Sequence, residues 1–380
     1  MSEADVERGT LRIAHTEASR GWGGQEIRIL TEAAGLRERG HEVVLYCPPE
    51  TRIAAEAAHY RVPVTLLPIA RKHPAGVLAL RRALVRDRLD VINTHSSTDS
   101  WLVALAARTL RSAPALVRTR HVSVPLAANA ATRWLYRRAT TRVVTTGEML
   151  RSQLIRDNGI VPERIDSVPT GIDARLFPPM ETRAARLQCG LAPEAAWIGI
   201  VATLRSWKGH RYLVEAMRHV RHHNARLAII GEGPQREALE LQVRAGHLAE
   251  RVLLAGHQRD VAPWLAALDV FALPSYANEG VPQAMLQAMF AGVPVVTTDA
   301  GAIPEIAQHE VTALVVPRED PVALAGAIDR LLSDRALASA LAQRAKAAVE
   351  QRYTREAMLD RMEQIFRRAI AQRGTGAGSA

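Results

Sequence analysis

Residues 269–298 read DVFALPSYANEGVPQAMLQAMFAGVPVVTT, and this stretch decides the fold. One apolar run ends at Ser275, a helical pattern extends from Pro282 to Gly292, and a second apolar run ends at Thr298. Residues 280–298 carry no charge, but prolines and glycines interrupt them, so a membrane span is not expected. Proline in the first turn and glycine at the end are typical of a helix. The stretch therefore predicts a strand–helix–strand unit of a buried parallel sheet.

The same alternation of short apolar runs and helical patterns continues along most of the chain. Helical patterns lie between the runs, as in residues 25–39, where Gly40 stands in the helix-ending position. This alternation predicts parallel sheets with helices on both faces. We expect strands at 11–16, 41–47, 90–95, 115–121 and 142–146, and then at 197–203, 226–233, 251–256, 269–275, 293–298 and 312–317.

A segment rich in proline and glycine, residues 167–190, interrupts the alternation. Because 380 residues exceed one ordinary core, we expect two doubly wound, Rossmann-like α/β domains, at 1–188 and 189–353. A last helix is expected at 354–371, and residues 372–380 are expected to form a disordered tail. One side of that helix is apolar and consists of Met358, Met362, Ile365, Phe366 and Ala369.

The composition, with 48% hydrophobic and 23% charged residues, is that of a globular protein. Two cysteines are too few for a disulfide framework, and the first residues lack the apolar core of a signal peptide, which favours the cytoplasm. The net charge is +10, and basic clusters lie at 81–88 and 132–142. They are either solvated helix faces or a peripheral contact with anionic lipid headgroups. Aromatic residues interleave little with them, so nucleic acid is not an expected partner.

Candidate sites follow from the expected sheets, because ligands of open parallel sheets bind beyond the carboxyl ends of the strands. Glu279 lies in such a loop, just before the helix that begins near Pro282. The first turn of a helix offers free N–H groups and partial positive charge, which suit a phosphate. The glutamate either belongs to a site or only complements the helix dipole, and both interpretations stay open.

One further motif follows the first strand of each half. In ATLRSWKGH (202–210), Arg205 and Lys208 either direct two cations toward a diphosphate or belong to a surface turn. In GWGGQE (21–26), glycines let the backbone approach a bulky anion, although their spacing departs from the dinucleotide-binding fingerprint. GEGPQR (231–236) departs from it too and predicts a tight turn.

Histidines end two expected strands of the first half, His95 and His121. Each is either a satisfied structural histidine or a donor to a sugar hydroxyl or a phosphate. No cysteine, histidine or aspartate grouping has metal-ligand spacing, so no metal is expected. No G-x-S-x-G segment for a serine nucleophile occurs either.

Together, these motifs resemble a known family. The paired glycines after the first strand, RSWKG, GEGP and the string PSYANEGVPQAMLQAMFAGVPVVTTDAGAIPEI (274–306) are similar to the retaining GT-B glycosyltransferases of family 4. The likeness runs from about residue 11 to 370 and is strongest across 196–320. It implies a GT-B fold whose last helix crosses back onto the N-terminal domain. It also implies transfer of a hexose-type sugar from a nucleotide diphosphate sugar, with retention and without a required metal.

The resemblance assigns roles to residues of this sequence. Glu279 matches the first glutamate of the family's E-x7-E motif, which contacts donor-sugar hydroxyls, and Gln287 stands where the second glutamate contacts the ribose. Lys208 matches the diphosphate lysine. Thr203 stands in the place of the usual arginine, and Arg205 is the candidate substitute.

The remaining implied positions lie in both halves of the chain. His121 matches the first-domain histidine near the donor sugar, and the implied catalytic set is His121, Glu279, Lys208 and Arg205. The implied diphosphate contacts, besides Arg205 and Lys208, are Gly23, Gly24, Val281 and Pro282. The loop GHQRD (256–260) matches the segment that packs on the base, through Gln258 and Arg259.

The expected partners follow from the same resemblance. The donor is expected to be UDP- or GDP-linked, no cofactor is expected, and the acceptor is a glycan or glycolipid, such as lipopolysaccharide or another cell-envelope polysaccharide. We expect a cytoplasmic monomer or weak dimer, with a peripheral place on the inner face of the cytoplasmic membrane as an option. Two alternatives stay open: a GT-B sugar-nucleotide 2-epimerase, for which we find no convincing pair of carboxylates, and a non-catalytic basic membrane-associated scaffold.

Overall fold

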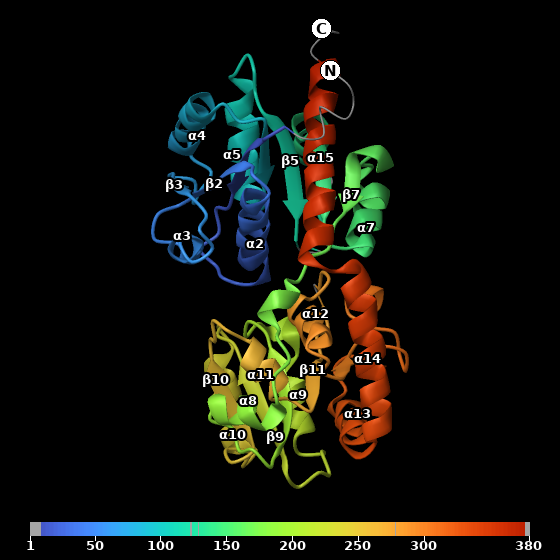
Figure 1. The fold of residues 1–380 in the computed structure, drawn as a ribbon. Coiled ribbons are helices and arrows are strands. Elements are labelled where there is room, and N and C mark those ends of the chain that lie inside the picture. The colour runs from blue at the N-terminus through green and yellow to red at the C-terminus, as the bar shows by residue number, and fades with distance from the viewer. Residues whose placement is uncertain (1–8, 122–123, 128, 278, 377–380) are drawn as a thin grey trace. The chain divides into compact units, whose positions relative to one another are not determined.

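The chain folds into two compact units, which we describe separately (Figure 1). Unit 1 comprises Met1–Gly171 and Arg355–Ala380, and unit 2 comprises Ile172–Thr354. The computed structural model describes residues 9–121, 124–127, 129–277 and 279–376. The first boundary lies before the one expected at 188/189, because helix α8 (Thr182–Gln188) buries Ala185 in the core of unit 2.

Within the described part of unit 1, seven parallel strands form one sheet in the order β3-β2-β1-β4-β5-β6-β7. The strands are β1 (Arg12–Thr16), β2 (Glu42–Cys47), β3 (Val64–Leu66), β4 (Val91–Thr94), β5 (Ala115–Arg120), β6 (Arg142–Thr145) and β7 (Ile165–Ser167). Strand β1 pairs with β2 and β4, which places His15 opposite Leu45 and Asn93. The strand order reverses between β1 and β4, and such a switch point is where ligands bind in open sheets.

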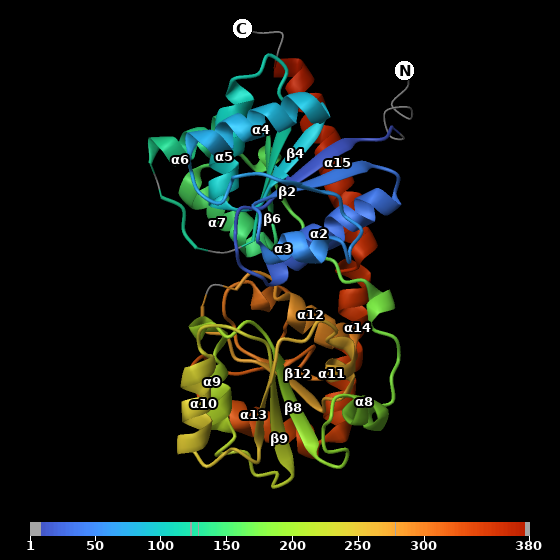
Figure 2. The same ribbon diagram turned by 90° about the vertical axis from the view of Figure 1, so that its left-hand side faces the viewer.

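Helices cover both faces of this sheet (Figure 2). One face packs against α2 (Gly24–Glu38), α3 (Arg52–Ala57) and α15 (Arg355–Gly376). The other packs against α4 (Pro74–Asp87), α5 (Ser97–Arg108), the π-helical turn Leu135–Ala139 that continues α6 (Ala130–Trp134), and α7 (Glu148–Asn158). Burial on both faces explains the apolar runs of the sequence, since every residue of β5 is buried.

In the described residues of unit 2, six parallel strands form a second sheet in the order β10-β9-β8-β11-β12-β13. The strands are β8 (Ala196–Val201), β9 (Ala225–Ile230), β10 (Val252–Gly256), β11 (Val270–Leu273), β12 (Val295–Thr297) and β13 (Leu314–Val315). The order again reverses at the first strand of the unit, between β8 and β11. Besides α8, the helices are α9 (His210–Ala216), α10 (Arg236–Ala245), α11 (Ala262–Ala266), α12 (Gln283–Phe290), α13 (Pro321–Ser333) and α14 (Arg335–Arg352).

Each strand expected from the sequence is present, and the quoted stretch forms β11, α12 and β12. The two doubly wound sheets confirm the expected fold class. Strands β3 and β7 were not expected, because each is three residues long and shows no repeating pattern. They lie at the two edges of their sheet.

The last helix, α15, belongs to unit 1, as the resemblance implied. Its apolar side is buried in the core beside α2, and the members are Met358, Leu359, Met362, Ile365, Phe366 and Ala369. The two helices approach closely at Gly35, where an added Cβ would lie 2.4 Å from a methyl group of Leu359. The helix extends through Gly376, so residues 372–376 are helical rather than disordered as expected, and residues 377–380 lie outside the described residues.

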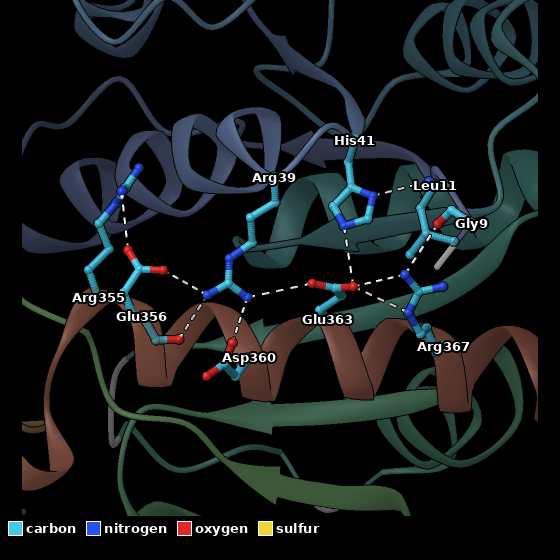
Figure 3. Close-up of polar contacts among 9 residues, drawn as sticks. All are labelled: Gly9, Leu11, Arg39, His41, Arg355, Glu356, Asp360, Glu363 and Arg367. Carbon is cyan, nitrogen blue, oxygen red and sulfur yellow. Dashed lines mark hydrogen bonds and ion pairs between the residues drawn. The ribbon is translucent and has the colours of Figure 1, made fainter. Parts of the chain in front are cut away.

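An ionic network joins the polar side of α15 to the end of α2 (Figure 3). The guanidinium of Arg39 lies 2.7 Å from carboxylate oxygens of both Glu356 and Asp360. Glu363 lies 3.5 Å from His41 and 2.8 Å from Arg367.

None of the helices in the described part of the chain is long and apolar enough to span a bilayer.

Candidate functional site

In unit 2, the candidate site is built around Glu279, which lies in the loop between β11 and α12. Its side chain is buried, with 3% of the residue exposed. Ser275, just after β11, donates a hydrogen bond to Oε1 at 2.6 Å. The Nζ atom of Lys208 lies 2.8 Å from Oε1 and 3.0 Å from Oε2. The structure thus brings together two of the predicted site residues, each beyond the carboxyl end of a neighbouring strand.

Two glycines with left-handed backbone hold this arrangement in place. Gly209 follows Lys208 with φ +76°, and an added Cβ would lie 2.0 Å from the carbonyl oxygen of Pro274. Gly301 has φ +56°, and its Cβ would lie 2.2 Å from the carbonyl oxygen of Glu279. That same oxygen accepts a hydrogen bond from the backbone N–H of Ala302 at 3.1 Å. No side chain larger than hydrogen fits at either glycine without moving the loop that carries the site.

The N-terminus of α12 lies next to Glu279 in the chain. Val281 and Pro282 are buried, Pro282 is the N-cap, and no side chain among the described residues caps the helix. The first-turn N–H groups are therefore available to an anion. Gln287 lies one turn further along the helix from Gln283, and its side chain is half-buried.

Arg205 is placed differently from Lys208. Its side chain is exposed, and its guanidinium lies over the ring of Trp207, 5.8 Å from the ring centre. Within the described residues, its side chain forms no hydrogen bond or ion pair. Arg205 immediately precedes the short turn Ser206–Lys208 that ends with Lys208, and its side chain contacts neither Lys208 nor Glu279.

The predicted base-binding loop follows β10, at the same carboxyl edge of the sheet. The amide of Gln258 donates to the carbonyl oxygen of Ala255 at 2.9 Å, and Arg259 is exposed. The tight turn predicted after β9 is present: Gly231 has φ +149°, and an added Cβ would lie 1.9 Å from the carbonyl oxygen of Ala202. This glycine lets the turn after β9 contact the loop after β8.

In unit 1, three histidines form a chain of contacts at the carboxyl ends of β1, β4 and β5. His121 Nε2 lies 2.9 Å from His95 Nδ1, and His95 Nε2 lies 3.0 Å from His15 Nδ1. His15 and His95 are buried, and His121 is half-buried. Burial lowers the pKa of His15 to about 3, with a smaller effect of the charge of Arg28. Burial and nearby positive charges also hold the pKa values of His95 and His121 well below the usual range, so all three rings are neutral at pH 7.

The glycine turn of unit 1 lies among buried carboxyl groups. Gly23 is the N-cap of α2 and Gly24 is its first residue. Glu17 accepts hydrogen bonds from the backbone of Ser19, at 2.7 Å, and from the amide of Gln25. Burial, followed by the nearby negative charge of Asp99, raises the pKa of Glu17 to about 8.

A hollow of about 420 Å³ opens beside this turn. Its lining residues are small, polar or basic: Ala18, Ser19, Arg20, Ala70, Arg71, Ser96 and Thr98. Asp99 accepts from the backbone N–H groups of Ser96 at 2.9 Å and of His95 at 3.0 Å, which immediately precede α5. The arginines and hydroxyl groups are the polar side-chain groups that line the hollow.

Several residues of these arrangements were not singled out from the sequence. Ser275 lies two residues after the end of β11, in the same motif as Glu279. Its position near a strand end was the signal that could have identified it. His15, Asn93 and Thr119 are polar residues of β1, β4 and β5. All three are fully buried, and buried polar residues near strand ends mark where these strands contribute to a polar cluster.

Comparison with known proteins assigns the chain to a family. Residues 22–176 match the family model described as Glycosyltransferase Family 4. Residues 195–334 match the model described as Glycosyl transferases group 1. One model thus lies in each half of the chain, and together they cover most of it.

Individual relatives agree with this assignment. D-inositol 3-phosphate glycosyltransferase of Mycobacterium marinum is 28% identical over 97% of this chain and 87% of its own length. The UDP-Gal:alpha-D-GlcNAc-diphosphoundecaprenol alpha-1,3-galactosyltransferase of Escherichia coli is 25% identical over 70% of this chain and 72% of its own. The crystal structure of Anabaena Alr3699/HepE in complex with UDP and glucose has a TM-score of 0.82 at 21% identity, covering 93% of this chain and 98% of that one. With the two doubly wound sheets and both family models in agreement, the chain belongs to the GT-B glycosyltransferases of group 1, family 4, and is an enzyme.

Proposed function

We propose that this enzyme transfers a hexose-type sugar from a UDP- or GDP-linked donor to a glycan or glycolipid, with retention and without a required metal ion. The observation that carries the proposal is the buried Glu279, held by Lys208 and Ser275 just before an uncapped helix N-terminus. Family membership makes the chain a glycosyltransferase, so neither the epimerase nor the scaffold is proposed.

The leaving diphosphate gains negative charge in the transition state, and positioned donors stabilise it. An ammonium group has three N–H donors, and Lys208 donates one hydrogen bond to Oε2 of Glu279 and forms an ion pair with Oε1. We assign its remaining donor capacity to a phosphate oxygen, and the first turn of α12, after Val281 and Pro282, supplies backbone donors. Arg205 reaches the diphosphate only if its side chain leaves the ring of Trp207.

The carboxylate of Glu279 is an acceptor, which suits the hydroxyl groups of a sugar. Because Ser275 and Lys208 fix its two oxygens, the carboxylate is preorganised, and binding a sugar costs little side-chain entropy. We assign Gln287 to the ribose, where an amide can donate and accept, and Gln258 and Arg259 to the base.

In unit 1, we assign His121 to the donor sugar and the turn at Gly23 and Gly24 to the diphosphate. No enzyme nucleophile was found in the sequence, so we propose front-face attack, in which the leaving phosphate oxygen takes the proton of the acceptor hydroxyl. A trapped covalent glycosyl-enzyme would contradict this step.

The acceptor is proposed from a relative and from the surface of unit 1. The E. coli relative is named for transfer to a diphosphoundecaprenol-linked sugar, which is a glycolipid. The arginines of the basic clusters at 81–88 and 132–142 are exposed, apart from the buried Arg142, and Trp101 and Trp134 stack at 5.7 Å near them with Arg108 over the second ring. Basic residues around paired tryptophans suit a peripheral contact with anionic headgroups.

The test is to incubate the enzyme with UDP- and GDP-sugars and to measure release of UDP or GDP, with and without a lipid-linked glycan. We expect slow hydrolysis of one donor, faster release with the acceptor, a product of unchanged anomeric configuration by NMR, and full activity in EDTA. The Glu279→Ala variant should lose transfer, whereas Glu237→Ala, an exposed position in the same unit, should retain it. Normal transfer by Glu279→Ala would refute the assignment of this site.

A further inference from the structure

The three histidine rings of unit 1 form a chain whose hydrogen bonds must run in one direction. Both bonds, His121 to His95 and His95 to His15, join ring nitrogens at 2.9 and 3.0 Å. A neutral imidazole has one N–H donor and one lone pair. His95 uses both nitrogens, so if it donates to one neighbour it accepts from the other. The whole chain therefore has only two states, which present opposite groups at the outer end.

The buried end of the chain determines which state is favoured. His15 Nε2 lies 4.0 Å from Glu32 Oε1, both side chains are fully buried, and this nitrogen has no hydrogen-bond partner among the described residues. Thr119 donates to the amide oxygen of Asn93 at 2.9 Å, which leaves the Asn93 NH₂ group to donate to Glu32 Oε1 at 3.3 Å. The other oxygen, Oε2, lies 3.5 Å from Arg28 Nε.

Both oxygens of Glu32 thus face donors, and the carboxyl group acts as an acceptor. An N–H of His15 directed toward Glu32 is attracted to it, whereas a lone pair there is repelled. With the proton of His15 on Nε2, its Nδ1 accepts from His95, and His95 in turn accepts from His121.

We propose that Glu32 sets the tautomer of His121 through the two rings between them. His121 then carries its proton on Nε2, and Nδ1 is left as a hydrogen-bond acceptor. This Nδ1 has no partner within the described residues, so it is available to a ligand. A lone pair at this position accepts from a hydroxyl group, the group that a sugar presents. The nature of the ligand rests on the proposed function, whereas the tautomer does not.

The surroundings of the chain keep the rings neutral, as this arrangement requires. Arg28 of α2 and Arg118 of β5 add positive charge near the chain, and burial disfavours a charged ring. From α15, the ring of Phe366 packs edge-on against His15, with ring centres 6.4 Å apart. His15, His95 and Glu32 are thus positioning residues, and His121 is the one that meets the ligand.

The direct test is NMR of the full-length enzyme with ¹⁵N-labelled histidine, without any substrate. Long-range ¹H–¹⁵N correlations distinguish the two tautomers, and the His121→Gln variant identifies its signals. We expect His121 to carry its proton on Nε2 at pH 7. In Glu32→Gln, the negative charge that attracts the His15 N–H is lost, so the preference should weaken and His121 should show a mixture of the two tautomers. A wild-type His121 protonated on Nδ1 would overturn the proposal whatever the variants show.

A second variant covers the case in which Glu32→Gln fails to fold, since it leaves Arg28 without its carboxylate. His15→Phe keeps a ring but removes both nitrogens, and should give His121 a mixture of tautomers and about a tenfold lower kcat/KM, mainly through a higher donor KM. His59→Phe, at an exposed position of the same unit, is the matched control and should change neither readout. An unchanged His121 tautomer in a folded His15→Phe protein would count against the chain. If the enzyme transfers no sugar at all, the function fails while the tautomer measurement still stands.

Discussion

Lys208 donates a hydrogen bond to Oε2 of Glu279 and forms an ion pair with Oε1, although 71 residues separate the two in the sequence. The lysine is the last residue of a short turn after β8, and the glutamate precedes α12, after the neighbouring strand β11. Neither charge is therefore isolated, and removal of either affects its partner as well as a ligand. This pairing leads to the first prediction.

Replacement of Lys208 by alanine should lower transfer about 10²–10³-fold, because one positioned donor to the developing diphosphate charge is lost. The carboxylate of Glu279 also loses its cation, so a lower melting temperature is expected. Steady-state kinetics and thermal unfolding measure the two effects. Lys346→Ala, which removes an exposed lysine of the same unit, should change neither. A fully active Lys208→Ala enzyme would exclude this lysine from the diphosphate site.

Gln287→Glu should tighten donor binding several-fold, because a carboxylate accepts hydrogen bonds from ribose hydroxyls more strongly than an amide does. Titration calorimetry with UDP- and GDP-sugars measures this. In contrast, Glu279→Ala should abolish transfer. If Gln287→Glu leaves donor affinity unchanged, Gln287 does not contact the ribose.

Gly301→Ala should lower activity at least tenfold, because its Cβ would lie 2.2 Å from the carbonyl oxygen of Glu279 and would displace the loop. Gly292→Ala is the matched control. It also has a left-handed backbone, with φ +75° against +56°, but no atom lies within 4 Å of its Cβ. It should cost about 1 kcal/mol of stability from the backbone alone and keep its activity. Equal activity of the two variants would show that the contact with Glu279 does not matter.

The free energy of unfolding should fall as the pH drops from about 6.5 toward 3, because buried neutral histidines take up protons only when the chain unfolds. The folded pKa of His15 is lowered from 6.5 to about 3, so its contribution is present above pH 6.5 and is lost across this window. Each such histidine adds a slope of about 1.4 kcal/mol per pH unit. Urea denaturation at several pH values measures it. His15→Phe should flatten the slope, and the exposed-site variant His59→Phe should not.

The two sides of α15 should contribute unequally to stability. Phe366→Ala should cost about 3–5 kcal/mol, because a buried ring is lost and a cavity remains. Arg39→Ala, which removes the partly exposed partner of Glu356 and Asp360, should cost about 1 kcal/mol. Only the loss of stability caused by Arg39→Ala should become smaller when denaturation is repeated in 1 M salt, because the Debye length falls to about 3 Å and the ion pairs are screened. A larger loss from Arg39→Ala than from Phe366→Ala would reverse this ranking.

Much of the fold followed from the sequence because strands buried on both faces leave continuous apolar runs. The edge strands β3 and β7 were not predicted because they lack such runs. Each is only three residues long, and none of the residues of β3 is fully buried. The extent of α15 was also underestimated, since residues 372–376 are rich in glycine and polar groups, yet the helix runs through Gly376.

The candidate site was predictable only in part. Motifs after strands identified Glu279 and Lys208, but not that they pair, since this depends on β8 and β11 being neighbours. In the same way, His15 and His95 lie 80 residues apart and meet because β4 pairs with β1. The sequence also does not predict the direction of an exposed side chain, and the side chain of Arg205 lies over Trp207 rather than toward Lys208.

The discontinuity of unit 1 has a consequence for how the protein is made. Unit 2 is one uninterrupted segment, so all of its residues are made before the last segment of unit 1. Unit 1 is translated first but includes α15, whose Met362 and Phe366 are fully buried against its sheet. The face of the unit 1 sheet that α15 covers therefore stays exposed until α15 has been made. Unit 1 is therefore started before unit 2 but completed after it.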